Sequence, residues 1–327
     1  MATTRLSDLV IPELWTPNFL LESKELTAFF ASGIVVQDPM MATLANGEGS
    51  TFNLRHLNDL ANDAENISSD DPSQKSTAKK ITGASLKAVK CMRNQSWSSM
   101  DLVAAVHAPD PVDAIRSRIA AYWQRRFQAC LVSQSVGIMA ANNGGNKDMI
   151  YDHTEVGDGK ISGVAIINAR ATMGDAADEL DVIVMHSVCK ANLDKQNLIQ
   201  YLRDKDGALI GETYLGFRVV VDDGMPVDTT TTPGTPLYTS MLFKSGFFRM
   251  GMGTPKTPTE IERVASSGNG EGEEILYSRQ QFILHPTGFS YISSVDNPAN
   301  TEFVKAGTWK REFDRKQTPL AFIKTKG

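Results

Sequence analysis

The sequence is short of cysteine and has no long apolar run, and these two absences exclude several classes of protein. Its three cysteines, Cys91, Cys130 and Cys189, lie far apart along the chain and form no C-x-x-C pair. We therefore predict reduced thiols in the core, neither a disulfide framework nor a zinc or redox site. No stretch of about 18 apolar residues exists, and the N-terminus has no signal-peptide pattern. We expect neither secretion nor a membrane span.

Positive charge is also scarce. The chain has 33 Lys and Arg against 38 Asp and Glu, which gives a net charge of -5. Affinity for nucleic acid comes largely from Lys and Arg that neutralise phosphates, so this balance disfavours a protein whose main role is to coat nucleic acid. The hydrophobic fraction of 41% is ordinary for a folded protein, and 327 residues suffice for one large domain or two ordinary ones.

The common catalytic motifs are missing as well. The sequence has no phosphate-binding loop of the G-x-x-x-x-G-K type, no H-E-x-x-H, no G-x-S-x-G and no EF-hand loop. The glycines around Met252 lack a third glycine and a following helix, so they predict a turn between strands and not a nucleotide cradle. The histidines lack metal-ligand spacing. We predict no metal, no cofactor and no enzymatic activity.

One pair of residues could still serve as a nucleophile and its base. His186 and Cys189 are three positions apart at the start of a predicted helix, where a thiolate would gain from the helix dipole. Asp181 or Asp194 could orient the imidazole. The simpler interpretation, which we prefer, is that His186 caps the helix and Cys189 faces the core.

The strongest local pattern predicts a helix from Asp110 to about Asn142. Asp110 suits the N-cap, Pro111 the first helical position, and Asp113 the positive end of the helix dipole. Apolar residues recur every four positions after that: Ile115, Ile119, Trp123, Phe127 and Leu131. At 1.5 Å per residue the helix would be roughly 45 Å long. The opposite side is rich in Arg and Gln, so it faces solvent or a partner.

Residues 46–100 predict a long projecting hairpin. Phe52, Leu54 and Leu57 alternate with polar neighbours, and residues 79–97 alternate in the same way. The connection at 58–75 holds five acids and one base, with few apolar residues. Such a segment counts against a compact turn and favours a mobile acidic tip.

The remainder mixes helices and strands, which indicates an α+β fold. We predict helices at 20–33, 163–180 and 186–202, strands at 180–187, 216–223, 236–248, 259–264 and 275–293, and a capped helix followed by a last strand at 320–326. A Gly, Ser and Glu loop at 266–274 is a second candidate for mobility. Residues 301–327 hold seven bases and three acids. The basic cluster at 310–316 includes acids, so it predicts a solvated helix or a subunit contact, not a nucleic-acid platform.

Taken in order, these segments resemble the major capsid proteins of tailed bacteriophages, which have the Hong Kong 97 fold. The resemblance is carried at sequence level by residues 4–35, 79–126, 214–226, 278–291 and 308–327. It implies an N-arm, an E-loop hairpin, a peripheral domain with a long spine helix, and an axial domain. The implied boundaries are 1–45 for the arm, 46–100 for the E-loop and its strands, 101–147 for the spine, 148–250 for the axial domain and 251–327 for the peripheral return strands and C-terminal segment.

The resemblance also implies which residues contact neighbouring subunits. In this fold the arm and E-loop reach over neighbours, so we expect interface roles for Trp15, Phe19, Phe29, Phe30, Phe52, Leu54, Arg55, Leu86 and Val89. We hypothesise that acids of the hairpin, Asp63, Asp70 and Asp71, meet basic groups of a neighbour. The candidate basic groups are Lys310, Arg311, Arg315 and Lys316.

The function implied is that of a virion structural protein. Hexamers and pentamers of the chain would form an icosahedral shell around double-stranded DNA, without sequence-specific binding. An acidic wall that repels phosphate is consistent with this role. Because the arm begins almost at Met1, we expect a separate scaffolding protein, and a portal and a decoration protein are further partners that the resemblance allows. Synthesis in the bacterial host cytoplasm follows.

Three alternatives stay open at this point. An encapsulin-type compartment of the same fold would enclose cargo enzymes instead of DNA. A tail-tube or other non-shell virion protein would form rings or rods. A thiol-dependent α/β enzyme would use Cys189 and His186.

Overall fold

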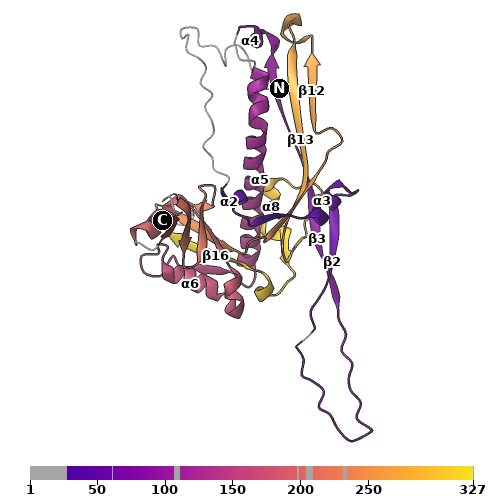
Figure 1. Cartoon of the computed structure of the whole chain (residues 1–327), viewed down its shortest axis with the longest axis vertical. Coiled ribbons are helices and arrows are strands. Elements are labelled where there is room, and N and C mark those ends of the chain that lie inside the picture. The colour runs from indigo at the N-terminus through magenta and orange to yellow at the C-terminus, as the bar shows by residue number, and fades with distance from the viewer. Residues whose placement is uncertain are drawn as a thin grey trace.

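The structure is a computed structural model, and it describes residues 28–60, 62–106, 111–196, 199–203, 209–230 and 234–326. An elongated body is built along the long helix α5 (Pro111–Gly144), and a rounder body lies beside it (Figure 1). A hairpin projects far from both (Figure 1). The predicted long helix is therefore present, although the proposed cap Asp110 lies outside the described residues.

The first sheet runs along α5. Its strand order is β1-β11-β13-β3-β2, and β12 pairs with β13. The strands are β1 (Val35–Gln37), β2 (Thr51–Leu57), β3 (Gly83–Met100), β11 (Phe248–Gly253), β12 (Thr259–Val264) and β13 (Glu273–Pro286). The antiparallel pair of β3 and β13 extends from Glu273 opposite Met100 to Ile283 opposite Lys90. One sheet thus joins three remote parts of the chain.

Helix α5 packs on this sheet through the apolar stripe predicted from its sequence. The rings of Phe127 and Phe282 meet edge to face at 5.0 Å, and the indole N–H of Trp123 donates to Ser278 at 2.9 Å. Near its other end, a Cβ at Gly137 would collide with the carbonyl of Phe303 in α8 (Asn300–Phe303). Glycine at 137 therefore permits the close approach of α8 to α5.

Helix α3 (Pro39–Asn46) is a feature that the sequence prediction missed. Its N-cap Asp38 accepts a hydrogen bond from the Met40 N–H at 2.8 Å, and proline occupies the first helical position. A Cβ at Gly251 or Gly253 would strike the α3 backbone. These glycines lie inside strand β11, so the prediction of a turn there is wrong: they let a helix lie directly on the strand.

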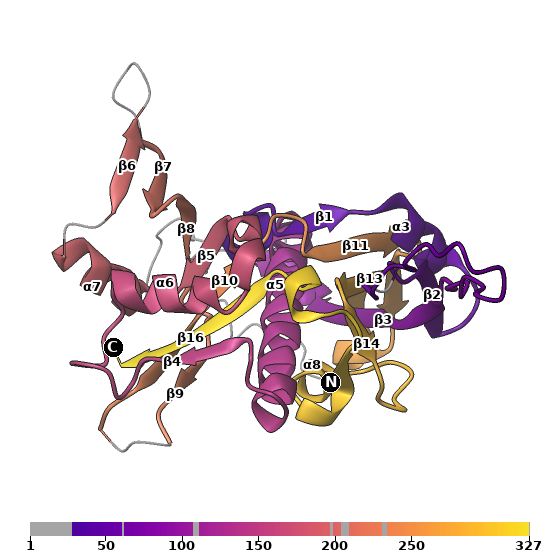
Figure 2. The ribbon, with the colours of Figure 1, turned by 90° about the horizontal axis from the view of Figure 1, so that it is seen from below.

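The second sheet forms the rounder body. Its order is β4-β16-β10-β5-β8-β7-β6, and β9 pairs with β10. The strands are β4 (Ile150–Asp152), β5 (Val182–Met185), β6 (Gln200–Arg203), β7 (Leu209–Tyr214), β8 (Phe217–Val221), β9 (Val227–Asp228), β10 (Leu237–Phe243) and β16 (Leu320–Lys326). Helices α6 (Gly163–Ala171) and α7 (Ser187–Lys195) lie together over this sheet (Figure 2). Their apolar residues share a core with β5, β10 and β16.

Two predictions in this region need correction. Helix α7 ends at Lys195 and not near residue 202, because residues 200–203 pair with β7 as strand β6. The last strand, β16, pairs with β10 and β4, so residues 320–326 belong to the second sheet and not with the rest of 251–327. A local hairpin with β7 ends the helix early, and pairing with distant strands places β16.

The remaining elements are short. They are α2 (Ala28–Ala31), α4 (Asp101–Val106), β14 (Phe289–Tyr291) and β15 (Trp309–Arg311). The predicted helix at 20–33 is described only over α2. The capped helix expected near the C-terminus is a single turn, α8, and the basic cluster at 310–316 spans β15 and a 3-10 turn at Arg315–Gln317.

The three cysteines are free and buried, as predicted. Cys91 on β3 and Cys130 on α5 form a hydrogen-bonded pair, although they are distant in sequence. Within the described ranges no helix is long and apolar enough to cross a membrane. Over the same residues, no three His, Cys, Asp or Glu side chains gather as metal ligands.

Candidate assembly interfaces

The projecting hairpin continues the β2–β3 ladder beyond the body. The ladder runs from Thr51 opposite Val89 to Leu57 opposite Gly83. Past that point the two arms of the hairpin are joined by side-chain contacts. The Asn66 amide donates to the Thr77 carbonyl, and Asp63 pairs with Lys79 at 3.1 Å. Apart from residue 61, which is not described, residues 58–82 are exposed on all sides. The predicted hairpin is confirmed as a geometric feature.

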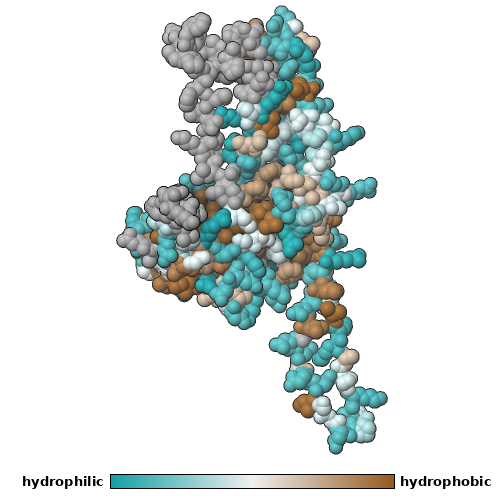
Figure 3. Space-filling view, in the orientation of Figure 1, coloured by the Kyte–Doolittle hydropathy of each residue, from teal (hydrophilic) through white to brown (hydrophobic). Residues whose placement is uncertain are grey.

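The hairpin exposes large apolar side chains that the rest of the chain does not cover. The exposed fraction is 72% for Leu57, 69% for Leu60, 90% for Ile67 and 53% for Ile81. Brown, hydrophobic patches along the projection show the same feature (Figure 3). Each would gain roughly 25 cal/mol per Å² on leaving water. The sequence prediction missed them because they stand singly among acids and amides.

Three side chains expected at subunit contacts are buried in their own subunit instead. Phe29 packs on Phe243 at 5.4 Å between ring centroids, and both lie in the main core. Leu86 and Val89 are also buried. A side chain without exposed surface cannot contact a neighbour, so the prediction is wrong for these three. Phe29 instead attaches the start of the described chain to strand β10.

The other expected contact residues are partly exposed or lie outside the residues that the structure describes. Phe52 and Leu54 are half-buried against α3, and Phe30 is half-buried against Phe127. Arg55 is exposed on the outer strand β2. Trp15 and Phe19 lie outside the described residues.

Two of the four basic side chains expected to meet a neighbour already bind within the subunit. Arg311 forms a two-pronged pair with Asp148, at 2.9 and 2.8 Å. Arg315 donates to the carbonyls of Asp148 and Thr318 and to the hydroxyl of Thr172. Burial lowers the pKa of Arg315 to about 10, so it stays charged at neutral pH. These two arginines join the C-terminal segment to the second body and are not free for a neighbour's acids.

Asp148 is held ionised by these contacts. Its partial burial acts to raise its pKa, but hydrogen bonds from Arg311 and Asn142 and the charges of both arginines bring the pKa below the ordinary value. The pair is therefore a structural link at the end of α5.

The remaining members of the proposed charge contact are exposed. Lys310 pairs with Glu312 at 2.9 Å and Lys316 with Asp175 at 2.6 Å, both at the surface. On the hairpin, Asp71 accepts hydrogen bonds from Ser73, which lower its pKa, and Asp70 is exposed. Within one subunit, the hairpin acids form no ion pair with any of the four candidate basic residues, Lys310, Arg311, Arg315 and Lys316.

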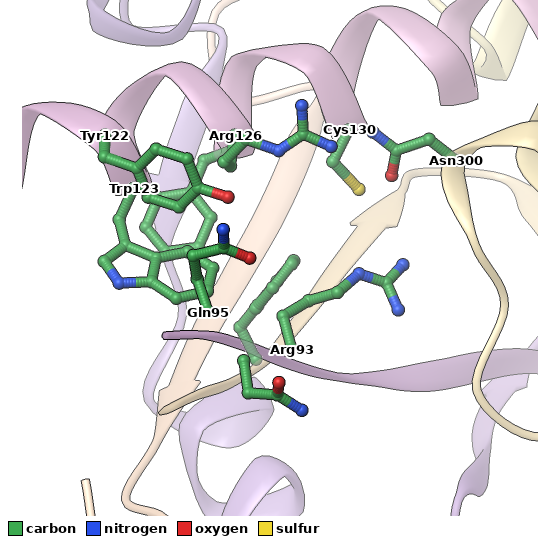
Figure 4. Close-up of a pocket in the computed structure, with 10 residues that line it drawn as sticks. Arg93, Gln95, Tyr122, Trp123, Arg126, Cys130 and Asn300 are labelled. Atoms are coloured by element: carbon green, nitrogen blue, oxygen red, sulfur yellow. The ribbon is translucent and has the colours of Figure 1, made fainter. Parts of the chain in front are cut away.

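A pocket of about 190 Å³ lies between α5 and β3, with α8 at its edge (Figure 4). Its aromatic side comprises Tyr122, Trp123, Phe127 and Phe282. Arg93, Asn94 and Gln95 line it from β3, and Arg126, Cys130 and Asn300 complete it. The pocket thus combines an apolar floor with amide and guanidinium groups.

Among the residues that the structure describes, no carboxylate pairs with the positive charge of this pocket. None of its ten lining residues is acidic. Arg93 donates only to neutral oxygens, those of the Asn297 amide and the Pro298 carbonyl. Across the described part of the chain, the exposed Arg126 guanidinium has neither an ion pair nor a hydrogen bond. No local sequence pattern marks this site, because four segments that are remote in the sequence build it.

The candidate nucleophile does not assemble. His186 caps α7 by accepting the Val188 N–H at 3.2 Å, and Cys189 is buried, which raises its thiol pKa. Asp181 accepts from the Ser245 N–H and Asp194 from the Tyr201 hydroxyl, so neither orients the imidazole. The preferred capping interpretation is confirmed.

Comparisons with known proteins agree with the architecture. No family model matches the chain. Among curated proteins, the major capsid protein of Bacillus phage SPP1 is 35% identical over 329 residues, covering 99% of this chain and 98% of the relative. That relative is a phage capsid protein, as the sequence resemblance predicts, and not an encapsulin or a tail-tube protein.

Solved structures show the same fold at low identity. The Cyanophage Pam1 capsid asymmetric unit matches with a TM-score of 0.63 at 10% identity, covering 100% of this chain and 99% of the other. The Ralstonia phage GP4 capsid matches with a TM-score of 0.58 at 10% identity, covering 100% and 98%. The fold is of the Hong Kong 97 type, and the chain belongs to the major capsid proteins of tailed bacteriophages.

Proposed function

We propose that hexamers and pentamers of this chain build an icosahedral shell around double-stranded DNA. The hairpin of β2 and β3 carries the proposal, because it extends away from the body with Leu57, Leu60, Ile67 and Ile81 uncovered. A soluble chain rarely leaves such side chains on a thin projection unless a partner covers them. In a shell of identical subunits, the neighbouring copy is that partner.

Each part of the fold has a role in this proposal. The hairpin acts as the E-loop and α5 as the spine helix of a peripheral domain built on the first sheet. The second sheet, with α6 and α7, acts as the axial domain, whose loops meet around the five- and sixfold axes. Gln128 of α5 attaches it to the spine by donating to Asp222, and Arg218 of β8 attaches it to the segment after α2 by donating to the Ser32 carbonyl at 2.5 Å.

This division suits a subunit that must fill several slightly different positions. The packed α5–β3–β13 layer keeps one shape, while the hairpin adjusts to each neighbour. The chain needs no catalytic step for this work, since interfaces do it. The buried Cys189 and the helix-capping His186 are consistent with a structural role.

The remaining partners follow from the same proposal. The net charge of -5 suits a wall that does not hold the genome by its phosphates. A separate scaffolding protein and a portal would guide closure, and a decoration protein could bind outside. The chain would be made in the host cytoplasm and reside in the virion.

Electron microscopy of the purified chain, with and without the scaffolding partner, tests the proposal. We expect closed shells, or rings of five and six subunits, with DNA inside particles taken from infected cells. A compact monomer under every condition would overturn it. Particles that hold only protein cargo would favour a compartment instead.

A further inference from the structure

The fold brings the thiols of Cys91 and Cys130 into hydrogen-bond contact. Cys91 lies in the buried part of β3, opposite Phe282 of β13, and Cys130 faces β3 from helix α5. Their exposed fractions are 0% and 1%. Cysteine spacing along the chain gives no sign of this pair, because the two residues are distant in the sequence. The chemistry of the pair therefore depends on the surroundings that the fold provides.

The pocket between α5 and β3 gives Cys130 a route to solvent. Cys130 lines this pocket, and its sulfur points from α5 toward β3 (Figure 4). Asn94, Gln95 and Arg126 line the same pocket and are exposed, so the pocket opens to water. Its volume of about 190 Å³ far exceeds the roughly 15 Å³ that a cavity needs to hold one water molecule. A molecule as small as hydrogen peroxide therefore fits beside the thiol.

The surroundings make Cys130 the more acidic of the two thiols. The hydrogen bond with Cys91 lowers the pKa of Cys130, and the charges of Arg93 and Arg126 lower it further, although burial acts in the opposite direction. The same hydrogen bond, together with burial, raises the pKa of Cys91. Because the thiolate is the nucleophilic form, Cys130 is the attacking thiol and Cys91 stays protonated beside it.

Cys189 shows what a thiol without these features is like. It lies on α7 in the core of the second sheet, where burial raises its pKa and its sulfur contacts the Thr325 hydroxyl at 3.8 Å. It does not line the α5–β3 pocket. Buried thiols of this kind are inert, so Cys189 serves as an internal reference.

We propose that Cys91 and Cys130 form a peroxide-reactive dithiol site, which closes into a disulfide and fixes strand β3 to helix α5. The Cys130 sulfur attacks one oxygen of hydrogen peroxide, the O–O bond breaks, and the released hydroxide takes the thiol proton and leaves as water. The Cys91 sulfur then attacks the resulting sulfenic acid, the S–S bond forms, the S–O bond breaks, and a second water leaves with the Cys91 proton. Two electrons thus pass from the two sulfurs to the peroxide.

The disulfide strengthens the layer that keeps one shape in the proposed shell. A bond between residues 91 and 130 closes a loop of the chain, which reduces the conformational freedom of the unfolded state. In a reducing cytoplasm the thiols stay reduced, and the bond forms once the particle reaches an oxidising medium. This timing rests on the proposed function, while the reaction itself needs only the folded chain.

Peroxide treatment of the folded, unassembled chain tests the site. The full chain is purified with its thiols reduced, treated with hydrogen peroxide, then unfolded in an alkylating reagent and mapped by mass spectrometry. We expect a disulfide between Cys91 and Cys130 in most chains, with Cys189 alkylated. A pair that remains fully alkylated, or oxidation of Cys189 as fast as that of the pair, would overturn the proposal.

Single substitutions separate the attacking thiol from the one that closes the bond. Cys91→Ser should leave Cys130 as a sulfenic acid, which a cyclic diketone reagent traps. Cys130→Ser should leave Cys91 reduced. Cys189→Ser is the matched control and should form the disulfide at the normal rate. Trapping of a sulfenic acid on Cys91 but not on Cys130 would refute the assigned roles.

Removal of one neighbouring charge tests the part played by the arginines. Arg126→Gln, at an exposed position, should slow disulfide formation about threefold, because a smaller fraction of Cys130 is ionised. Lys195→Gln removes the same charge from the exposed end of α7 and should leave the rate unchanged. Equal rates in Arg126→Gln and the unmodified chain would show that the guanidinium does not activate the thiol.

Thermal unfolding tests whether the bond fixes β3 to α5. Oxidation should raise the unfolding temperature by roughly 5 °C, and a thiol reductant should reverse the change. Cys130→Ser, treated in the same way, controls for methionine oxidation and should show no rise. No rise in chains shown to hold the disulfide would overturn the stabilising role. Shell formation is scored separately by electron microscopy, so its failure would overturn the proposed function and leave the thiol chemistry standing.

Discussion

The middle of strand β3 and the hairpin at its N-terminal end differ sharply in how their side chains are covered. From Ala88 to Cys91 the strand is buried between α5, α3 and β13, while the hairpin that begins at Gly83 leaves Leu57, Leu60 and Ile67 in solvent. The buried part of β3 stabilises the fold, and the uncovered hairpin is available for assembly.

Replacing residues 62–80 with a two-residue turn should produce the largest effect. We expect shell formation to be lost completely, because the tip and its uncovered Ile67 are gone. The stability of the unassembled chain should change little, since these residues make no core contact. Electron microscopy and chemical denaturation measure the two quantities. Shells of normal size from this variant would contradict the division of roles.

Gly137→Leu is the opposite case, and should damage the fold before assembly. A side chain there collides with the Phe303 carbonyl and the Trp309 ring, which hold α8 and the C-terminal segment on α5. We expect a loss of about 3 kcal/mol or more in the free energy of unfolding. Gly144→Leu, at the open end of the same helix, is the matched control and should lose far less. Equal losses at both positions would refute the packing argument.

The sequence predicted the long helix and the projecting hairpin, but not which strands pair with each other. Long local patterns sufficed for α5 and for the hairpin, because one periodicity runs through each. The membership of β16 in the second sheet depended on pairing with segments far away in the sequence. Strand β6 after α7 depended on a hairpin with the next strand, β7. The Asp38-Pro39 signal before α3 was present and overlooked.

The candidate interfaces were harder to predict for the same reason. Tertiary neighbours, which no local pattern reveals, bury the side chains of Phe29, Leu86 and Val89. They also place Asp148 where it pairs with Arg311. The α5–β3 pocket needs residues 93–95, 122–130, 282 and 300 together. The apolar residues of the tip were visible in the sequence, but they have no periodicity that marks them as contacts.

The packed region should also respond to pH in a way that the hairpin does not. Full burial and then the charge of Arg249 lower the pKa of His285 to about 4, against an ordinary 6.5. The unfolded chain therefore binds the proton more readily, so stability is complete above pH 6.5 and falls as the pH drops toward 4. The loss approaches roughly 3 kcal/mol at 1.36 kcal/mol per pKa unit.

His285→Gln isolates that effect, because glutamine does not titrate. Thermal unfolding at pH 7 and pH 5 should show a smaller shift between the two values for the variant than for the unmodified chain. The control is His56→Gln on β2, where the histidine is only partly buried. This variant should keep the change in unfolding temperature between pH 7 and pH 5. The same shift in the unmodified chain and in His285→Gln would mean that other groups carry the acid sensitivity.

Lys79→Ala should produce the smallest effect on the isolated chain. The pair of Lys79 with Asp63 spans the hairpin at 3.1 Å, but both side chains are more than half exposed, at 58% and 52%. Water and salt screen such a pair, so its loss should change the free energy of unfolding by less than about 0.5 kcal/mol. If shell yield falls while this value holds, the pair shapes the tip for its neighbour. A large loss of stability in the unassembled chain would instead show that the hairpin contributes to the fold, and the contrast between the middle of β3 and the hairpin would fail.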